Sequence, residues 1–151
     1  MAASIWKKKP SFTEIALFAE ACLFLFLAAF LKKFVPFRCY AGLLGKHGAS
    51  MDADRGAADP ERVTPLVRAI DRAARHLPIE NRCLDQALCG FFMLRRRRLP
   101  SDLYLGVDRN ESREIVAHAW LKSGDCFVTG RIGHRNYTII SVFARRPSAR
   151  N

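Results

Sequence analysis

The five cysteines include no C-x-x-C pair and follow no regular spacing, so the sequence lacks a disulfide framework. His and Cys residues with the spacing of zinc ligands are also missing, and we expect neither a metal nor a cofactor. Scattered free thiols are typical of a reducing compartment, which favours a cytoplasmic protein. The cysteines are Cys22, Cys39, Cys83, Cys89 and Cys126.

Internal repeats and low-complexity tracts are absent as well, and half of the 151 residues are hydrophobic. This length fits one domain that buries a sizeable core, with an appended element. No small-residue cleavage site follows the N-terminal apolar run; the basic segment 32–38 follows instead. We therefore do not expect the run to be an export signal.

The apolar run 15–31 contains one charged residue, Glu20, and follows two candidate helix caps, Ser11 and Thr13. As a helix it would be about 25 Å long, short of the ~30 Å hydrocarbon core of a bilayer. In order of preference, it is expected to pack inside the protein, to lie on a membrane surface, or to form a short span. The span comes last because a glutamate at mid-length is costly in lipid.

The net charge of +11 favours anionic partners such as acidic peptides or phospholipid surfaces. Much of it lies in the clusters 7–9, 95–98 and 145–150, where the ends of elements are expected and charges are solvated. The interleaved aromatic pattern of RNA-binding sheets is missing, so nucleic-acid binding is not expected.

Residues 46–59 are rich in Gly, Ala, Asp and Ser, and this composition predicts a linker. It divides the chain into an N-terminal apolar helix segment, 1–45, and a domain over 60–151. Asp59–Pro60 predicts the first helix start of that domain, with Thr64–Pro65 as a second possible start.

Asn81 can cap a further helix over 82–97, whose last turn holds the arginines. Beyond residue 100 the hydrophobic period changes from helical to alternating, with strand-like runs and a turn at Ser123–Gly124 that predicts a hairpin. Helices followed by antiparallel strands predict an α+β fold. The strand-like runs are 103–107, 115–122, 126–129 and 137–143.

Cys83 lies at the start of the predicted helix 82–97, and His118 lies in a later strand, within Ala-His-Ala-Trp. A cysteine at a helix start meets the positive end of the helix dipole and unpaired N–H groups, which favour the thiolate. A histidine on a following strand can take its proton, and the pair is the minimum for nucleophilic acyl chemistry. Spacing alone leaves open an inert buried cysteine and a core histidine. Asp85, in the first turn of the same helix, is expected to lie at the surface or to complement the helix dipole there.

A cysteine at a helix start followed by a hairpin whose first strand carries His is the layout of papain-like and transglutaminase-like folds. The sequences RCLDQAL (82–88), LGV (105–107) and AHAW (117–120) together resemble the leader peptidases of lasso peptide biosynthesis. This is the transglutaminase-like family named for the C-terminal domain of the microcin-processing protein. The resemblance covers roughly residues 62–130, and the segment 34–38 resembles the family's leading segment.

The resemblance implies a cysteine protease that removes the leader from a ribosomally made lasso precursor, with Cys83 as nucleophile and His118 as base. It also implies two protein partners besides the precursor's leader peptide. One is a small separate protein that grips the leader, because this chain shows no obvious leader-recognition domain. The other is an ATP-dependent cyclase that closes the new N-terminal amine onto an Asp or Glu side chain.

The family places an acid about twelve positions after the histidine, where this sequence has Gly130. A turn at 123–124 predicts that His118 faces Thr129 across the hairpin. Asp125 would then lie ~10 Å along the hairpin, at 3.2–3.4 Å per residue. We therefore expect the Thr129 hydroxyl, or a nearby backbone carbonyl, to orient the imidazole.

Two other functions fit the same residues. One is a different acyl-transfer enzyme of the transglutaminase-like fold, such as a transglutaminase or an amidase. The other is a non-catalytic, basic binding protein that associates with a membrane through residues 15–31.

Overall fold

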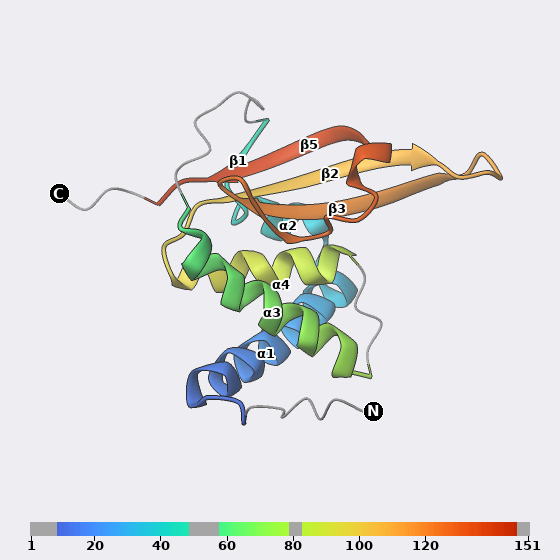
Figure 1. Cartoon of the computed structure of the whole chain (residues 1–151). Coiled ribbons are helices and arrows are strands. Elements are labelled where there is room, and N and C mark those ends of the chain that lie inside the picture. Colours follow the sequence, from blue (N-terminus) through green and yellow to red (C-terminus); the bar gives the residue numbers. More distant parts are fainter. Residues whose placement is uncertain (1–8, 49–57, 79–82, 148–151) are drawn as a thin grey trace, which may run out of the picture.

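A five-stranded antiparallel sheet forms one layer of the protein, and helices cover one of its faces (Figure 1). This computed structural model describes residues 9–48, 58–78 and 83–147. The α+β fold predicted from the sequence is confirmed. The strands are β1 (Lys46–His47), β2 (Ser101–Arg109), β3 (Ile115–Ser123), β4 (Cys126–Thr129) and β5 (Thr138–Arg145), and their order in the sheet is β1-β5-β2-β3-β4.

The two longest helices, α1 and α3, begin at side-chain caps. They are α1 (Phe12–Phe34), α2 (Phe37–Ala41), α3 (Pro60–His76) and α4 (Cys83–Arg96), and a short 3₁₀ turn covers His134–Asn136. Ser11 caps α1, with its hydroxyl accepting from the Glu14 amide at 3.2 Å, and Asp59 caps α3. Pro65 therefore lies inside α3, and Thr64–Pro65 does not start it.

The core lies between α4 and the sheet, with α1 and α3 packed behind α4. Helix α4 approaches the sheet closely at Gly90, where a Cβ atom would lie 2.7 Å from Leu121 Cδ2. Side chains on the other face of the sheet form a small aromatic cluster instead, in which the rings of Tyr104 and Trp120 stack at 5.5 Å. Alternation along each strand separates these two faces.

Helix α1 forms the layer farthest from the sheet (Figure 1). Its buried residues are Leu17, Ala21, Leu25 and Ala28, and they join the same core as α3 and α4. By length and composition alone α1 could also cross a membrane, a test that core helices of soluble proteins pass too.

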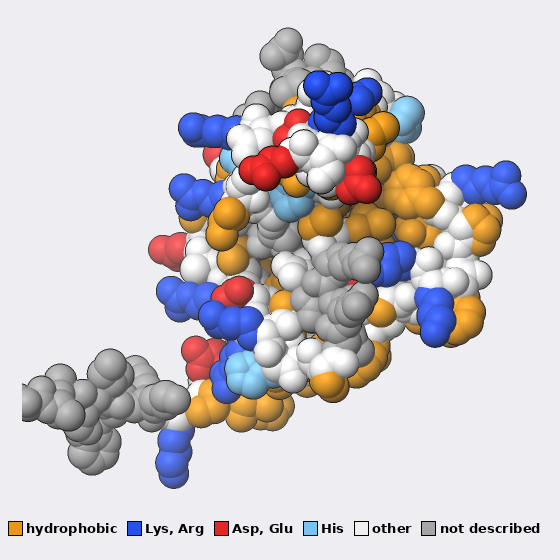
Figure 2. All heavy atoms as spheres, turned by 90° about the vertical axis from the view of Figure 1, so that its right-hand side faces the viewer, with side chains coloured by type: hydrophobic (Ala, Val, Ile, Leu, Met, Phe, Trp, Pro, Cys, Tyr) orange, Lys and Arg blue, Asp and Glu red, His pale blue; other side chains and the backbone are white. Residues whose placement is uncertain are grey.

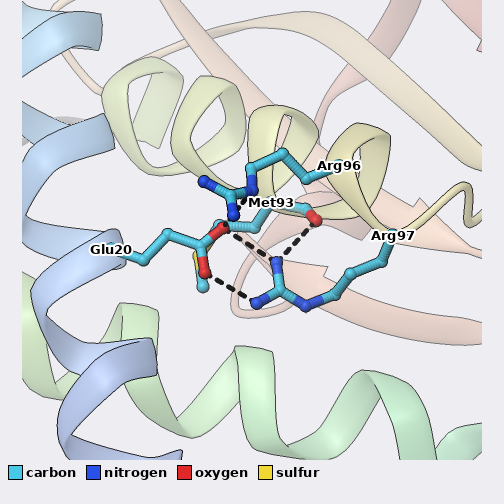
Figure 3. A network of polar contacts seen from close by, with 4 residues as sticks. All are labelled: Glu20, Met93, Arg96 and Arg97. Carbon is cyan, nitrogen blue, oxygen red and sulfur yellow. Dashed lines mark hydrogen bonds and ion pairs between the residues drawn. The ribbon is translucent and has the colours of Figure 1, made fainter.

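Glu20 ties the middle of α1 to the end of α4 (Figure 3). Arg97 donates to both of its carboxylate oxygens, at 2.8 and 2.6 Å, and also to the Met93 carbonyl at 3.0 Å. Arg96 lies 3.4 Å from the same carboxylate. The expectation that the arginine run is merely solvated is wrong for Arg97, because α1 brings an acid to the end of α4.

The start of the predicted linker is ordered. Lys46 and His47 form β1 and pair with Ala144 and Phe143 of β5. Residues 49–57, which make up most of the predicted linker, lie outside the described residues, as does the predicted cap Asn81.

Candidate active site

Cys83 is the first residue of α4 and is a partly exposed free thiol. The first N–H groups of an α-helix have no partners within the helix and point toward its N-terminal end. The thiol therefore sits where the helix dipole is positive, beside backbone N–H groups that have no partner within the helix. This placement agrees with the helix start predicted from the sequence.

His118 lies on β3 and is partly buried against aromatic rings on the outer face of the sheet. Its ring lies 5.8 Å from Trp120 and 4.9 Å from Tyr137. The two strand neighbours His118 and Trp120 share a face, as alternation predicts. Strand β4 pairs with β3 only over Leu121–Ser123, so in the described part of the chain the edge of β3 beside His118 has no strand partner on that side.

The imidazole is held by one backbone contact: His118 Nε2 lies 3.0 Å from the carbonyl oxygen of Gly130. A carbonyl can only accept, so this contact requires the proton on Nε2. In the neutral ring Nδ1 then carries the lone pair, and Nδ1 is the atom able to take a proton.

Cys83 and His118 line the walls of the same two cavities. One is a cleft of about 820 Å³ bounded by α3, the start of α4, β4 and the chain after it. The other is a cavity of about 420 Å³ between the sheet, Leu84 and the α1–α2 junction. No hydrogen bond between the two side chains is found among the described residues. Such contacts in enzymes often form only when substrate binds.

The two cavities differ in chemistry. The larger cleft is polar. Its wall contains the charged residues Asp71, Asp125 and Arg131 and the neutral amide of Gln86. The smaller cavity is lined mostly by apolar side chains; among the described residues on its wall, Lys32 carries a charge, and Tyr40 and His118 are polar. The lining residues are Lys32, Val35, Pro36, Phe37, Tyr40, Cys83, Leu84, Leu105, Gly106, Ala117, His118, Ala119 and Ile140.

The predicted hairpin register is wrong. The structure pairs Ser123 with Cys126 and Leu121 with Thr129, with a bulge between Leu121 and Lys122. The turn is therefore Gly124–Asp125. Ser123 stays in the strand because it is buried and its hydroxyl donates to the Pro100 carbonyl at 2.7 Å.

The shifted register removes the basis for Thr129 as the orienting group. Its Oγ1 is buried and makes no hydrogen bond in the described part of the chain, while the Gly130 carbonyl holds His118. The second expected possibility, a nearby backbone carbonyl, describes the observed contact. Asp125 is exposed at the hairpin turn and lines the larger cleft.

Gly130 cannot carry an acid in this backbone. Its φ is +70°, and a Cβ atom would lie 2.5 Å from the Ala119 carbonyl oxygen. A side chain at this position would have to displace the backbone of β3 next to His118. The chain thus presents a carbonyl dipole at the place where the related family is expected to present a carboxylate.

A partly buried ion pair supports the first turn of α4. Asp85 is completely buried, and its Oδ2 accepts from Lys32 Nζ of α1 at 2.6 Å. Burial, and then the negative charge of Asp85, raise the pKa of Tyr40. The expectation that Asp85 lies at the surface is wrong because α1 and α2 cover it. Its spacing of three and four from the buried Leu88 and Cys89 was the available signal.

The remaining thiols differ in burial. Cys89 is buried with its Sγ donating to the Ala21 carbonyl at 3.4 Å, and burial raises its pKa strongly. Burial also raises the pKa of Cys22. Cys39 is exposed and Cys126 lines the larger cleft. Within the described residues no group of three His, Cys, Asp or Glu side chains is arranged to hold a metal.

A family model described as the transglutaminase-like superfamily matches residues 31–142, which is well over half of the chain. The match includes the last turn of α1, the start of α4 and all of β3. Searches among curated proteins and among solved structures gave no match.

Proposed function

The chain belongs to the transglutaminase-like superfamily, and on that premise we propose that it is a cysteine peptidase that removes the leader from a lasso precursor peptide. The superfamily includes cysteine peptidases and acyltransferases. One observation carries the choice of residues: a helix-start thiol and a histidine with a fixed tautomer line the same cleft.

The proposed reaction uses two atoms, Cys83 Sγ as the nucleophile and His118 Nδ1 as the base. His118 Nδ1 takes the Cys83 thiol proton, and the sulfur attacks the scissile carbonyl carbon. When the C–N bond breaks, Nδ1 returns the proton to the leaving amine and a thioester remains on Cys83. Water, deprotonated by the same nitrogen, then attacks the thioester, which releases the carboxylic acid and restores the thiol.

The Gly130 carbonyl keeps the imidazole in the reactive tautomer throughout this cycle. It also stabilises the imidazolium, whose Nε2–H points at a carbonyl dipole. A carboxylate, with its full negative charge, would stabilise the imidazolium more strongly. The Gly130 carbonyl therefore acts more by orienting the imidazole than by stabilising its charge.

Backbone and side-chain donors near Cys83 can hold the oxyanion. The Cys83 N–H stands at the helix start, where unpaired amides gather. Gln86, one turn further along α4, lines the same cleft and contributes an amide. We assign Gln86 as the second donor of this site.

An extended peptide fits the arrangement because the catalytic pair lies between two cavities. Residues on one side of the scissile bond would meet the polar cleft, and a residue on the other side would meet the apolar cavity. The resemblance of residues 82–88 and 117–120 to lasso leader peptidases supports a leader peptide as this substrate. It also supports a separate leader-recognition protein and an ATP-dependent cyclase as partners.

The deciding experiment incubates the full chain with the short precursor peptide and the leader-recognition protein encoded beside its gene. Mass spectrometry follows the precursor. The wild type should release the leader, whereas Cys83→Ala and His118→Ala should not. Cys126→Ala is the matched control, because it removes a second thiol from the same cleft and should leave cleavage intact.

Three results would change the assignment. Cleavage by Cys83→Ala at the wild-type rate would end the cysteine-peptidase proposal. Amide products formed with an added primary amine, in place of the free acid, would assign an acyltransferase. Absence of a neighbouring precursor and cyclase gene would remove the lasso substrate while leaving the chemistry of the site.

A further inference from the structure

The outward face of α1 is apolar, whereas the outward face of a helix in a soluble protein is usually polar. Residues at spacings of three and four along the whole helix are exposed and apolar: Phe12, Ile15, Ala19, Leu23, Phe26, Phe30 and Phe34. Five of these large side chains keep half or more of their area exposed, at positions where the helix of a soluble protein carries polar residues: Phe12, Ile15, Leu23, Phe30 and Phe34. We call this set the α1 outer face.

The charged residues of α1 point elsewhere. Glu20 pairs with Arg97, and Lys32 pairs with Asp85, so both face the domain. Glu14 takes part in the cap with Ser11 at the helix start. The outer face therefore contains no charged side chain except at its end, where the Lys33 ammonium lies 5.5 Å above the Phe34 ring.

We propose that the α1 outer face binds the surface of an anionic phospholipid bilayer, with α1 lying in the plane of the membrane. The face is about 33 Å long, at 1.5 Å per residue. A protein partner of this extent would normally find a hydrogen-bonding group every 100–200 Å² or so. This face offers none along its length, whereas acyl chains require none.

The charge of the chain agrees with lipid headgroups as the neighbours of this face. Lys33 at one end, exposed Lys9 before the other end, and the net charge of +11 favour an anionic surface. Figure 2 shows hydrophobic side chains along the lower and right-hand edges of that view, with Lys and Arg side chains standing among them on the right. Basic side chains beside an apolar face are the usual composition of interfacial helices.

A transmembrane orientation of α1 conflicts with its contacts. Leu17, Ala21, Leu25 and Ala28 are buried in the domain core, and the two ion pairs join α1 to both ends of α4. Spanning the bilayer would expose this stripe and separate both ion pairs. The helix can therefore bind lipid with one face while the other stays in the domain.

Co-flotation of the full chain with vesicles tests the proposal. Vesicles of mixed phosphatidylcholine and phosphatidylglycerol should carry the wild type upward in a density gradient, and phosphatidylcholine alone should carry less. The double variant Phe26→Gln, Phe30→Gln should bind the vesicles at least roughly tenfold more weakly. It lacks two aromatic rings whose transfer from water into the membrane favours binding. The double variant Ile115→Gln, Ile132→Gln changes two exposed apolar residues on the sheet side and should float like the wild type.

Further measurements separate other occupants of the face. Alkaline carbonate should release the bound protein, and retention after this wash would assign a span and overturn the proposal. Equal flotation of the wild type and the Phe26→Gln, Phe30→Gln variant would also overturn it. A concentration-dependent dimer that this variant abolishes would overturn the proposal as well. Vesicle binding that appears only after deletion of residues 1–8 would also overturn it. Cys83→Ala should float normally, so the result does not depend on the proposed peptidase activity.

Discussion

His118 Nε2 donates to the backbone carbonyl of Gly130 at 3.0 Å, and this contact decides which ring nitrogen can act as a base. A backbone carbonyl cannot be removed by mutation, but it can be moved. Gly130 makes this possible, since its positive φ and its approach to Ala119 leave no room for a side chain.

Gly130→Ala should lower kcat by roughly 10²-fold or more, the contribution of a positioned general base. Gly133→Ala is the matched control, because its φ is also positive, at +78°, but a Cβ there meets nothing within 4 Å. Both variants strain the backbone, and only the first displaces the carbonyl. Steady-state cleavage by mass spectrometry makes the comparison. Equal losses in both would mean that strain, and not the His118 contact, limits activity.

Thr129→Val should retain most activity and full stability, because its buried Oγ1 has no hydrogen-bond partner to lose. Asp125→Asn should also retain most turnover, since Asp125 lies at the turn. Steady-state cleavage kinetics of both variants and a thermal melt of Thr129→Val would test these expectations. A loss near the ~10⁴-fold seen when a true triad acid becomes an amide would make Asp125 the third catalytic residue.

Lys32→Met should destabilise the protein more than Asp85→Asn, because the first change leaves a carboxylate buried without its counter-ion. The cost should be about 1–3 kcal/mol, below that of a fully buried pair, since Lys32 is 33% exposed. Urea unfolding measures both. Asp85→Asn should also lower the pKa of Tyr40, whose phenolate it no longer repels; an ultraviolet titration against Tyr40→Phe would show this. An unchanged tyrosine titration would contradict the arrangement.

The Glu20–Arg97 pair should make stability depend on pH in the acid range. Hydrogen bonds from Arg97 hold the pKa of Glu20 below its ordinary value near 4.5, although burial opposes them. This contribution is complete above the unfolded-state pKa and is lost as pH falls through the lower folded-state pKa. At neutral pH Glu20→Gln should cost about 1.5–3 kcal/mol. The difference from wild type should shrink as pH falls below the ordinary glutamate pKa and vanish once the folded-state carboxyl is protonated.

A surface ion pair gives the control for that measurement. Asp71→Asn removes the exposed pair with Arg75 and should cost under ~0.5 kcal/mol. Chemical unfolding at several pH values would record all three proteins. A Glu20→Gln difference that stays constant down to strong acid would show that packing, and not charge, accounts for the contact.

The apolar cavity beside Cys83 should select a large apolar residue next to the cleaved bond, if the peptidase proposal holds. Ile140→Ala should lower kcat/KM on such substrates by up to roughly tenfold and leave substrates with small residues unaffected. Ile115→Ala removes an isoleucine of similar exposure that lines neither cavity, and it should change nothing. Cleavage of a peptide series with Leu, Gly or Asp on each side of the bond would reveal the preference. A flat preference would remove the cavity from substrate recognition.

The sequence by itself determined the local elements, including the helix start at Cys83 and the strand that carries His118. Ser11 and Asp59 mark helix starts because their oxygens accept first-turn amides, and alternation marks β2 to β5. Cys83 at a helix start is also a local property, since it depends on residues close by in the chain. These features need no distant contact, so composition and spacing were enough to predict them.

Only the tertiary structure decided the hairpin register and the burial of Asp85. Ser123–Gly124 and Gly124–Asp125 are both acceptable two-residue turns, and the buried contact from Ser123 to Pro100 selects the second. That choice brings the Gly130 carbonyl, and not the Thr129 hydroxyl, to His118. Asp85 is buried because Lys32, far away in the chain, lies against it. Such contacts join segments whose separation no local pattern encodes, and packing alone brings them together.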